Sequence, residues 1–306
     1  MKCSTGNVRG MAALLTGLLF LVMTAPAVLA DETVDESGPA SPTGTVMIEN
    51  IAGSIKVIGW DRDEITVEGT LSDDVKELEF ETGRKKSRIK VVYPRKSKNI
   101  KGGADLVIKV PAECRLDIEC VSASIEISGV TGSIFASNVS GDVDVAGECR
   151  EIHAETVSGD LFLDGGARET AAGSISGRVK ILGSQADVEV STVSGDIDLV
   201  FDKLLDMSVE SLSGEVGIEG DLDPDGSFDF ELHSGNLVLT VPANVSADFE
   251  INTFSGDIDN AFGQKSHRTS KYAPGRELEF STGGGDARVR INTFSADVVI
   301  RKMLSL

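Results

Sequence analysis

Residues 139–143 read VSGDV, residues 157–161 read VSGDL and residues 193–197 read VSGDI. Each segment is an apolar residue, a serine, a small residue, a polar residue and an aliphatic residue. Related segments occur as VSASI at 121–125, ISGRV at 175–179, LSGEV at 212–216, HSGNL at 233–237, FSGDI at 254–258 and FSADV at 294–298. Successive serines are 18 residues apart at first, and then 19, 21, 21 and 40 residues apart. This regular spacing predicts a repeat architecture in which each copy is one structural unit.

Alternating residues flank the repeated segments. Ile197-Asp198-Leu199 follows one copy and Val188-Glu189-Val190 precedes it. Such alternation predicts two short strands per unit and no helix. Eighteen residues are too few to bury an aliphatic face alone, but stacked units bury it against their neighbours. The sequence therefore predicts an all-β fold, a single-stranded parallel β-solenoid (β-helix) with about 18–21 residues per coil. Its hand stays open, because right-handed crossovers are the rule while left-handed hexapeptide helices also have 18-residue coils.

The alternation predicts two inward-facing rows of side chains. The aliphatic row consists of Ile125, Val143, Leu161, Val179, Ile197, Val216, Leu237, Ile258 and Val298. The small-residue row, two positions before each serine, consists of Cys120, Asn138, Thr156, Ser174, Thr192, Ser211, Leu232, Thr253 and Thr293. A glycine after the serine suits a corner that a Cβ would resist. The serine–glycine pairs expected at these corners are Ser140-Gly141, Ser158-Gly159, Ser176-Gly177, Ser194-Gly195, Ser213-Gly214 and Ser255-Gly256.

The chain divides into four segments. Residues 1–30 have a basic start, an apolar middle and small residues before Ala30, which predicts a secretory signal peptide cleaved there; a retained anchor is the alternative. Residues 31–43, DETVDESGPASPT, are predicted to be a disordered acidic linker. Residues 44–121 are predicted to be an irregular N-terminal β cap with the first coils, and residues 122–302 the solenoid repeats. Residues 275–280 are the candidate for a degenerate coil in the long gap before Ser295.

The runs IENIAGSIKVIGWDRDEITVEGT and DLVIKVPAECRLDIECVSASIEI, followed by several VSGDIDL-like units, resemble the bacterial DUF4097 family, which is often given the provisional label of adhesin. The tail GGGDARVRINTFSADVVIRK resembles the same family's closing coil. The resemblance covers about residues 44–302 and implies an exported or envelope β-solenoid without catalytic residues. His233 and Arg178 depart from it, because they replace an apolar and an acidic residue.

Charge narrows the range of partners. With 29 basic against 49 acidic residues the net charge is −20, which argues against a nucleic-acid partner. One basic segment interrupts this balance, and its nine residues are Arg84, Lys85, Lys86, Arg88, Lys90, Arg95, Lys96, Lys98 and Lys101. It is a candidate patch for an anionic glycan, lipid head group or acidic protein. The alternative is a solvated hairpin facing the acidic residues 73–81.

The corner aspartates Asp142, Asp160, Asp196 and Asp257 are weak candidates for a Ca²⁺-binding column. Arg178 interrupts that column and allows it to neutralise itself by ion pairing. The loops also lack the doubled glycines of calcium-binding repeats. Turn-forming aspartates in solvent are therefore the favoured interpretation.

Cysteine and histidine give little sign of chemistry. Cys114, Cys120 and Cys149 are expected to be buried, inert thiols, because their repeat positions place them too far apart for a bridge. The three histidines, His153, His233 and His267, occupy different coil positions, which favours neither a zinc site nor a nucleophile–base pair. Outward-facing Phe162, Val238 and Val299 suggest a mildly apolar stripe.

These observations predict a non-enzymatic, exported protein of the periplasm, cell surface or envelope, without cofactor or metal. Its expected partner is an envelope or surface protein or glycan. The alternatives are a scaffold that self-associates end to end, and a polysaccharide-active β-helix enzyme. The enzyme is disfavoured because the near-loopless central coils build no cleft.

Overall fold

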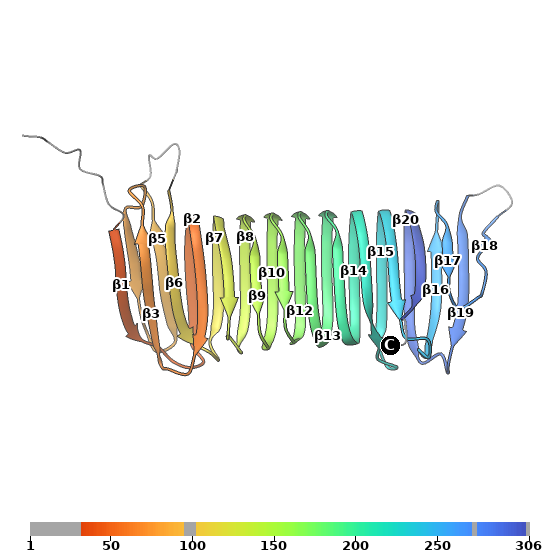
Figure 1. The fold of residues 1–306 in the computed structure, drawn as a ribbon, viewed down its shortest axis with the longest axis horizontal. Coiled ribbons are helices and arrows are strands. Elements are labelled where there is room, and N and C mark those ends of the chain that lie inside the picture. The colour runs from red at the N-terminus through yellow and green to blue at the C-terminus, as the bar shows by residue number, and fades with distance from the viewer. Residues whose placement is uncertain (1–31, 95–101, 271–273, 304–306) are drawn as a thin grey trace, which may run out of the picture. The chain divides into compact units, whose positions relative to one another are not determined.

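The computed structural model describes residues 32–94, 102–270 and 274–303, and in these ranges the chain forms strands and turns with no helix. The predicted all-β class is confirmed. Figure 1 shows the strands of the described residues side by side in one long row. The proposed signal peptide, residues 1–30, lies outside the described residues. Within the described residues no helix is long and apolar enough to cross a membrane.

Each central turn of the chain contributes one longer and one shorter strand. The strands here are β8 (Ser133–Ser140), β9 (Val143–Ala146), β10 (Cys149–Ser158), β11 (Leu161–Asp164) and β12 (Ala167–Ser176). On the long-strand face, β8, β10 and β12 pair in parallel, with Thr156 opposite both Asn138 and Ser174. On the short-strand face, β9 and β11 pair in parallel, with Leu161 opposite Val143. The repeat period of 18 residues is thus the length of one turn.

The longer repeats are accommodated locally. The following strands are β13 (Val179–Ser194), β14 (Ile197–Leu222) and β15 (Ser227–Val241). The parallel register of β13 and β14 shifts by one residue at Ala186/Asp187, which explains the spacing of 19 between Ser194 and Ser213. The spacing of 21 that follows accommodates a turn at residues 223–226.

Both predicted inward rows are buried. The aliphatic row is at most 1% exposed from Ile125 to Leu237 and at Val298, and only Ile258 is half-buried. Ile258 lies in β17 (Ile258–Asn260), which pairs on one side only, with β20 (Ala287–Lys302). All nine members of the small-residue row are buried as well. The core is therefore a narrow apolar layer between the two faces.

The order of turns at the C-terminal end differs from the order in the chain. β20 pairs in parallel with β15 on one side and with β16 (Ala247–Thr253) on the other. The prediction that residues 275–280 form a degenerate coil is wrong. They begin β19 (Arg276–Thr282), which is antiparallel to β16 and also pairs with β18 (His267–Arg268). An antiparallel hairpin covers the edge of the last turn, where a further parallel coil would leave it open.

The N-terminal end has a matching arrangement. β2 (Thr45–Trp60) pairs in parallel with β7 (Arg115–Ser128) on one side and with β5 (Lys86–Val92) and β6 (Ala104–Pro111) on the other. β4 (Glu77–Glu81) is antiparallel to β5, and β3 (Glu64–Leu71) is antiparallel to β6. Antiparallel ladders at both ends make the sheet mixed. The expected boundary at residues 121/122 falls inside β7, so both parts share one sheet.

The disordered linker predicted for residues 31–43 is wrong for most of its length. Glu32–Pro39 forms β1, which pairs antiparallel with β3 from Glu32 opposite Leu71 to Pro39 opposite Glu64. Most side chains of β1 are exposed, so its sequence shows no apolar alternation. Backbone hydrogen bonds to the edge of β3 hold the segment in place as a strand. Its acidic side chains also protect the sheet edge against further pairing.

Candidate functional site

The residue before each recurring serine is exposed, and at every position except His233 it is apolar. We call this line the apolar row; in spatial order its members are Val121, Val139, Val157, Ile175, Val193, Leu212, His233, Phe294 and Phe254. The eight hydrophobic members are 41% to 55% exposed. They face outward because the residue before each one belongs to the buried small-residue row, and successive residues of a strand point to opposite faces.

The row ends in a stack of three rings. His233 and Phe294 are parallel within 2° with centroids 4.9 Å apart, and Phe254 stacks on Phe294 at 4.9 Å and 7°. This separation matches the spacing of neighbouring strands. Both faces of Phe294 and one face each of His233 and Phe254 are therefore covered within the stack.

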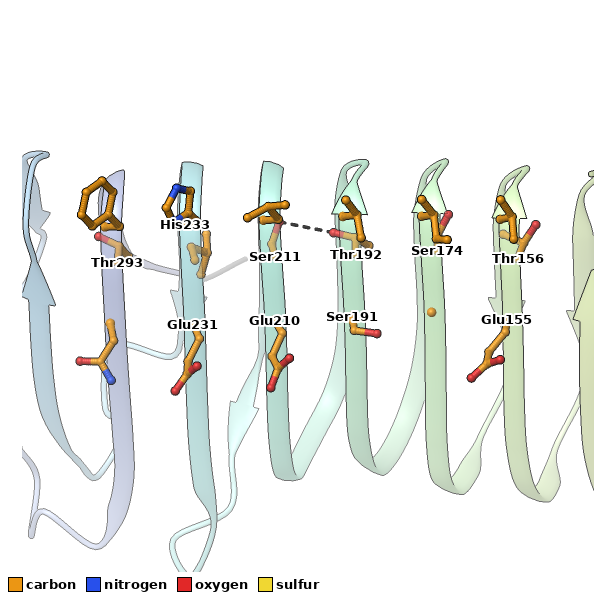
Figure 2. A pocket seen from close by; sticks show the side chains of 18 of the residues that line it. Glu155, Thr156, Ser174, Ser191, Thr192, Glu210, Ser211, Glu231, His233 and Thr293 are labelled. Atoms are coloured by element: carbon orange, nitrogen blue, oxygen red, sulfur yellow. Dashed lines mark hydrogen bonds between the residues drawn. The ribbon is translucent and has the colours of Figure 1, made fainter. Parts of the chain in front are cut away.

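A groove of about 950 Å³ runs beside the apolar row across β8, β10, β12, β13, β14, β15 and β20. Its floor is the small-residue row from Asn138 to Thr293. Its second wall is the outward residue three positions before each serine, and these residues are Ser137, Glu155, Gly173, Ser191, Glu210, Glu231 and Asn292. We call Glu155, Glu210 and Glu231 the acidic wall. Figure 2 shows their side chains on one side of the Thr156–Thr293 line, with His233 on the other.

The floor of the groove is held by local hydrogen bonds. Asn138 Nδ2 donates to the carbonyl oxygens of Ala123 and Gly141, at 2.7 and 3.0 Å. Thr192 Oγ1 lies 3.3 Å from Ser211 Oγ, the contact dashed in Figure 2. The buried hydroxyls of Thr156 and Ser174 have no partner among the described residues. The side chains of the floor are thus polar but buried. A ligand in the groove would contact mainly the side chains of the two walls.

A second, smaller groove of about 470 Å³ lies nearer the start of the long strands. Carboxylates from four successive turns, Glu151, Glu169, Asp187 and Asp206, lie opposite one another in register along it. No group of three or more His, Cys, Asp or Glu side chains is placed to bind a metal, as far as the described residues go. These carboxylates make the long-strand face strongly negative.

The corner aspartates have a structural role in the described chain. Asp142 Oδ1 accepts the backbone N–H of Asp160 at 2.9 Å, and Asp160 Oδ1 accepts that of Arg178 at 2.8 Å. Asp196 Oδ1 accepts the N–H of Glu215 at 3.0 Å, and the N–H of Asp257 donates to Asp297 Oδ1.

The ion pairing expected of Arg178 is wrong, since within the described part of the chain its contact with this column is through its backbone N–H. One oxygen of Asp142, Asp160 and Asp196 is thus occupied by the next turn. Asp257 pairs with Arg276 at 3.0 Å. A Ca²⁺ role for this column stays untested.

The basic segment is partly neutralised within the fold. Arg88 Nε lies 2.9 Å and Lys90 Nζ 2.7 Å from the Glu49 carboxylate. Burial alone would raise the pKa of Glu49, but the hydrogen bonds from Lys90 and Arg88 outweigh it and lower that pKa below its usual value. β4 and β5 form the hairpin that places acidic residues beside basic ones, as the alternative interpretation supposed.

Three further residues of the basic segment, Arg84, Lys85 and Lys86, are exposed at the start of β5. The remaining members, Arg95, Lys96, Lys98 and Lys101, lie outside the described residues. Binding of an anionic partner by this patch stays a prediction.

None of the three described cysteines lines the groove, and His233 is the histidine that does. Cys114 and Cys120 are buried, Cys149 is half-buried, and all three are free thiols. Burial raises the pKa of Cys114 and Cys120 to about 12 and that of Cys149 to about 11. The predicted burial is thus found at Cys114 and Cys120, whereas Cys149 is only half-buried.

The other sequence candidates are separated. His153 contacts Glu155 at 3.0 Å, and His267 contacts Glu277 at 2.8 Å. The suggested stripe of Phe162, Val238 and Val299 lies on the short-strand face and is half-buried. Only Val238 and Val299 are neighbours in register. The groove and the apolar row, which the sequence analysis did not identify, are the candidate site. The strand alternation that placed the small-residue row inside already implied that the next residue along each strand faces outward.

Comparison with known proteins gives one family match. The family model described as Toastrack DUF4097 matches residues 45–301. A Bacteroides fragilis protein, provisionally described as an adhesin, is 8% identical with a TM-score of 0.39 over 89% of this chain and 97% of its own. A Clostridium sporogenes protein, provisionally described as a cell adhesion protein, is 11% identical with a TM-score of 0.21 over 89% of this chain and all of its own. No functionally curated protein matches the chain. At these identities and scores the two structures support no functional argument, and the family match stands by itself.

Proposed function

This chain belongs to the Toastrack DUF4097 family, and we propose that it is a non-enzymatic, adhesin-like binding module of the cell envelope. In this proposal residues 1–30 direct export and are removed after Ala30. The turns then form a parallel β-solenoid of about 18–21 residues per coil. The long-strand face binds the partner.

The observation that carries the proposal is the continuity of the apolar row. Its members follow one another from strand to strand in register, from Val121 on β7 to Phe294 on β20, and Phe254 stacks on Phe294. Soluble monomers rarely display contiguous apolar surface on this scale, and such patches commonly mark interaction sites. A single exposed valine is ordinary, but an exposed apolar side chain on successive turns forms a continuous apolar surface.

Replacing the centre of the row tests the binding role. The triple variant Val157→Thr, Ile175→Thr and Val193→Thr keeps β-branched side chains while adding hydroxyls, so the strands are expected to remain folded. We expect its retention on purified envelope fractions to fall about tenfold in a sedimentation assay, which equals about 1.4 kcal/mol. The matched control is Val200→Thr, an exposed valine on the short-strand face. Equal retention of the triple variant and the unmodified protein would refute the proposal.

Export and the two alternative functions have separate readouts. Mass spectrometry of the exported protein is expected to find Asp31 at its N-terminus. A mass in light scattering that rises steadily with concentration would instead support the self-assembling scaffold. Turnover of a polysaccharide that is abolished by an acidic substitution would support the enzyme.

A further inference from the structure

We propose that the groove binds an extended cationic peptide segment, with its apolar side chains against the apolar row and its Lys or Arg side chains toward the acidic wall. This inference rests on the proposed binding function and names the class of partner. The peptide would lie across the strands, along the direction in which the turns stack. Because the backbone of interior strands is already paired, recognition must come from side chains.

Charge selects the sign of the partner. Within the described residues Glu210 and Glu231 form no ion pair, and Glu155 pairs with the exposed His153. The neighbouring row of Glu151, Glu169, Asp187 and Asp206 adds to the same negative potential. A partner that brings positive charge gains from this field, while an anionic glycan is repelled. A second copy of this chain is also disfavoured, because its own net charge is −20 and the facing walls would be alike.

The shape of the apolar row favours peptide side chains over sugar rings. A sugar packs its flat face on an exposed aromatic face, but both faces of Phe294 and the faces of His233 and Phe254 turned toward it are covered within the stack. The rest of the row is aliphatic and continuous, so it offers a ridge for apolar side chains at any register. Such a surface binds apolar side chains by removing them from water.

The spacing of the acidic wall suits an extended chain. Glu155 and Glu210 lie three strands apart, and the positions between them are occupied by Gly173 and by the short side chain of Ser191. At about 4.8 Å per strand, this separation is about 14 Å. Residues i and i+4 of an extended peptide are also about 14 Å apart and point to the same side. A cation at every fourth residue can therefore reach both glutamates, while the alternate residues contact the apolar row.

A defined peptide tests the inference. The probe is a fluorescein-labelled peptide, Lys-Val-Ser-Val-Lys-Val-Ser-Val-Lys, and its partner probe has Glu in place of each Lys. Fluorescence anisotropy at low ionic strength is expected to show saturable binding of the lysine peptide to the full chain and none of the glutamate peptide. The triple variant Glu155→Lys, Glu210→Lys and Glu231→Lys is expected to bind the lysine peptide at least about tenfold more weakly and to gain binding of the glutamate peptide. This gain also shows that the variant is folded.

The matched control moves the same charge change to the short-strand face. Asp144→Lys, Asp164→Lys and Asp198→Lys replace exposed carboxylates there and alter the net charge equally, and we expect the affinity for the lysine peptide to change less than about threefold. Equal losses in both triple variants would overturn the inference, because only the overall field would then matter. Unchanged binding in the acidic-wall variant would overturn it as well.

Other occupants have their own outcomes. Dimerisation in sedimentation that the Val157, Ile175 and Val193 substitutions abolish would identify a second copy as the occupant and overturn the peptide. Binding of dextran or heparin in competition with the peptide would overturn it in favour of a glycan. If those threonine substitutions remove envelope binding while the lysine peptide never binds, the proposed function stands and this inference fails.

Discussion

The corner glycines reveal how closely successive turns approach. A Cβ built on Gly159 would lie 2.2 Å from the carbonyl oxygen of Gly141, and one on Gly177 would lie 1.9 Å from that of Gly159. At Gly141 the backbone is also in the left-handed region, with φ of 123°. In the central turns the glycine is therefore required mainly by the stacking of backbones, and less by the angle of each corner. This close contact between backbones explains why glycine recurs after the serine in the repeat.

Adding one methyl group to the column tests that account. Gly177→Ala is expected to lower the free energy of unfolding by about 1–3 kcal/mol, because the backbone of the preceding turn has to move. Urea titration followed by circular dichroism measures the change. Gly217→Ala is the control, since its Cβ would meet neighbours only at 3.8 Å or more. Equal stability of the two variants would contradict the close-approach argument.

The buried thiols make stability depend on alkaline pH. Burial holds the pKa of Cys114 and Cys120 at about 12 in the folded chain, against an ordinary value of 9.0. Above about pH 9 the unfolded chain loses these protons while the folded chain keeps them, so folding is penalised progressively up to about pH 12. We expect the free energy of unfolding to fall over this window, and to fall less steeply in Cys114→Ala/Cys120→Ala. Parallel pH profiles of the variant and the unmodified chain would show that the thiols do not contribute.

At the scale of elements, pairing at the ends overrides the order of the chain. β20 lies between β15 and β16, so Glu231 faces Asn292 directly while Asn252 is one strand further on. β2 is enclosed in the same way by β7 on one side and β5 and β6 on the other. Each long terminal strand thus gains two parallel neighbours. The antiparallel strands outside them pair with the edges that would otherwise be exposed.

Engineered cysteines distinguish this order from a sequential one. Glu231→Cys/Asn292→Cys is expected to form a disulfide on oxidation, because neighbouring strands are about 4.8 Å apart. Glu231→Cys/Asn252→Cys is expected to stay reduced, since two strand spacings exceed the reach of a disulfide. Both are made in a Cys149→Ser background and read by peptide mass spectrometry. The opposite result would indicate that the turns follow chain order.

At the scale of the whole described chain, we expect the repulsion between like charges to exceed the attraction of the ion pairs. Carboxylates in register along the long strands lie one strand apart, and like charges directly opposite each other are destabilising. The net charge of −20 adds a general repulsion that favours expansion of the chain. The same arrangement supplies the negative field proposed to attract a cationic partner.

Moderate salt is therefore expected to stabilise the protein. The thermal midpoint should rise as NaCl increases from about 0.01 to about 0.15 M, where the Debye length falls from about 30 to about 8 Å. Differential scanning calorimetry measures the shift. Glu169→Lys should show a smaller rise, because it places a positive charge between Glu151 and Asp187 on the neighbouring strands. A midpoint that stays constant or falls over this range would argue against net repulsion.

Local patterning determined much of this protein. The 18-residue period and the two-residue alternation are properties of short segments, and they sufficed to predict an all-β repeat and its two buried rows, such as Val179 and Thr192. The exposure of Val157 and Ile175 follows from the same alternation. These features could be read from the sequence because each depends only on neighbours in the chain.

Only the tertiary structure decided which segments meet at the ends and what the long-strand face presents. Acidic Glu32–Pro39 has no periodicity of its own and becomes a strand because β3 offers an edge. The stack of His233, Phe294 and Phe254 exists because β20 lies between β15 and β16. Backbone hydrogen bonds between strands are nearly independent of side-chain identity, so a local pattern predicts that a strand forms but not which distant strand will pair with it.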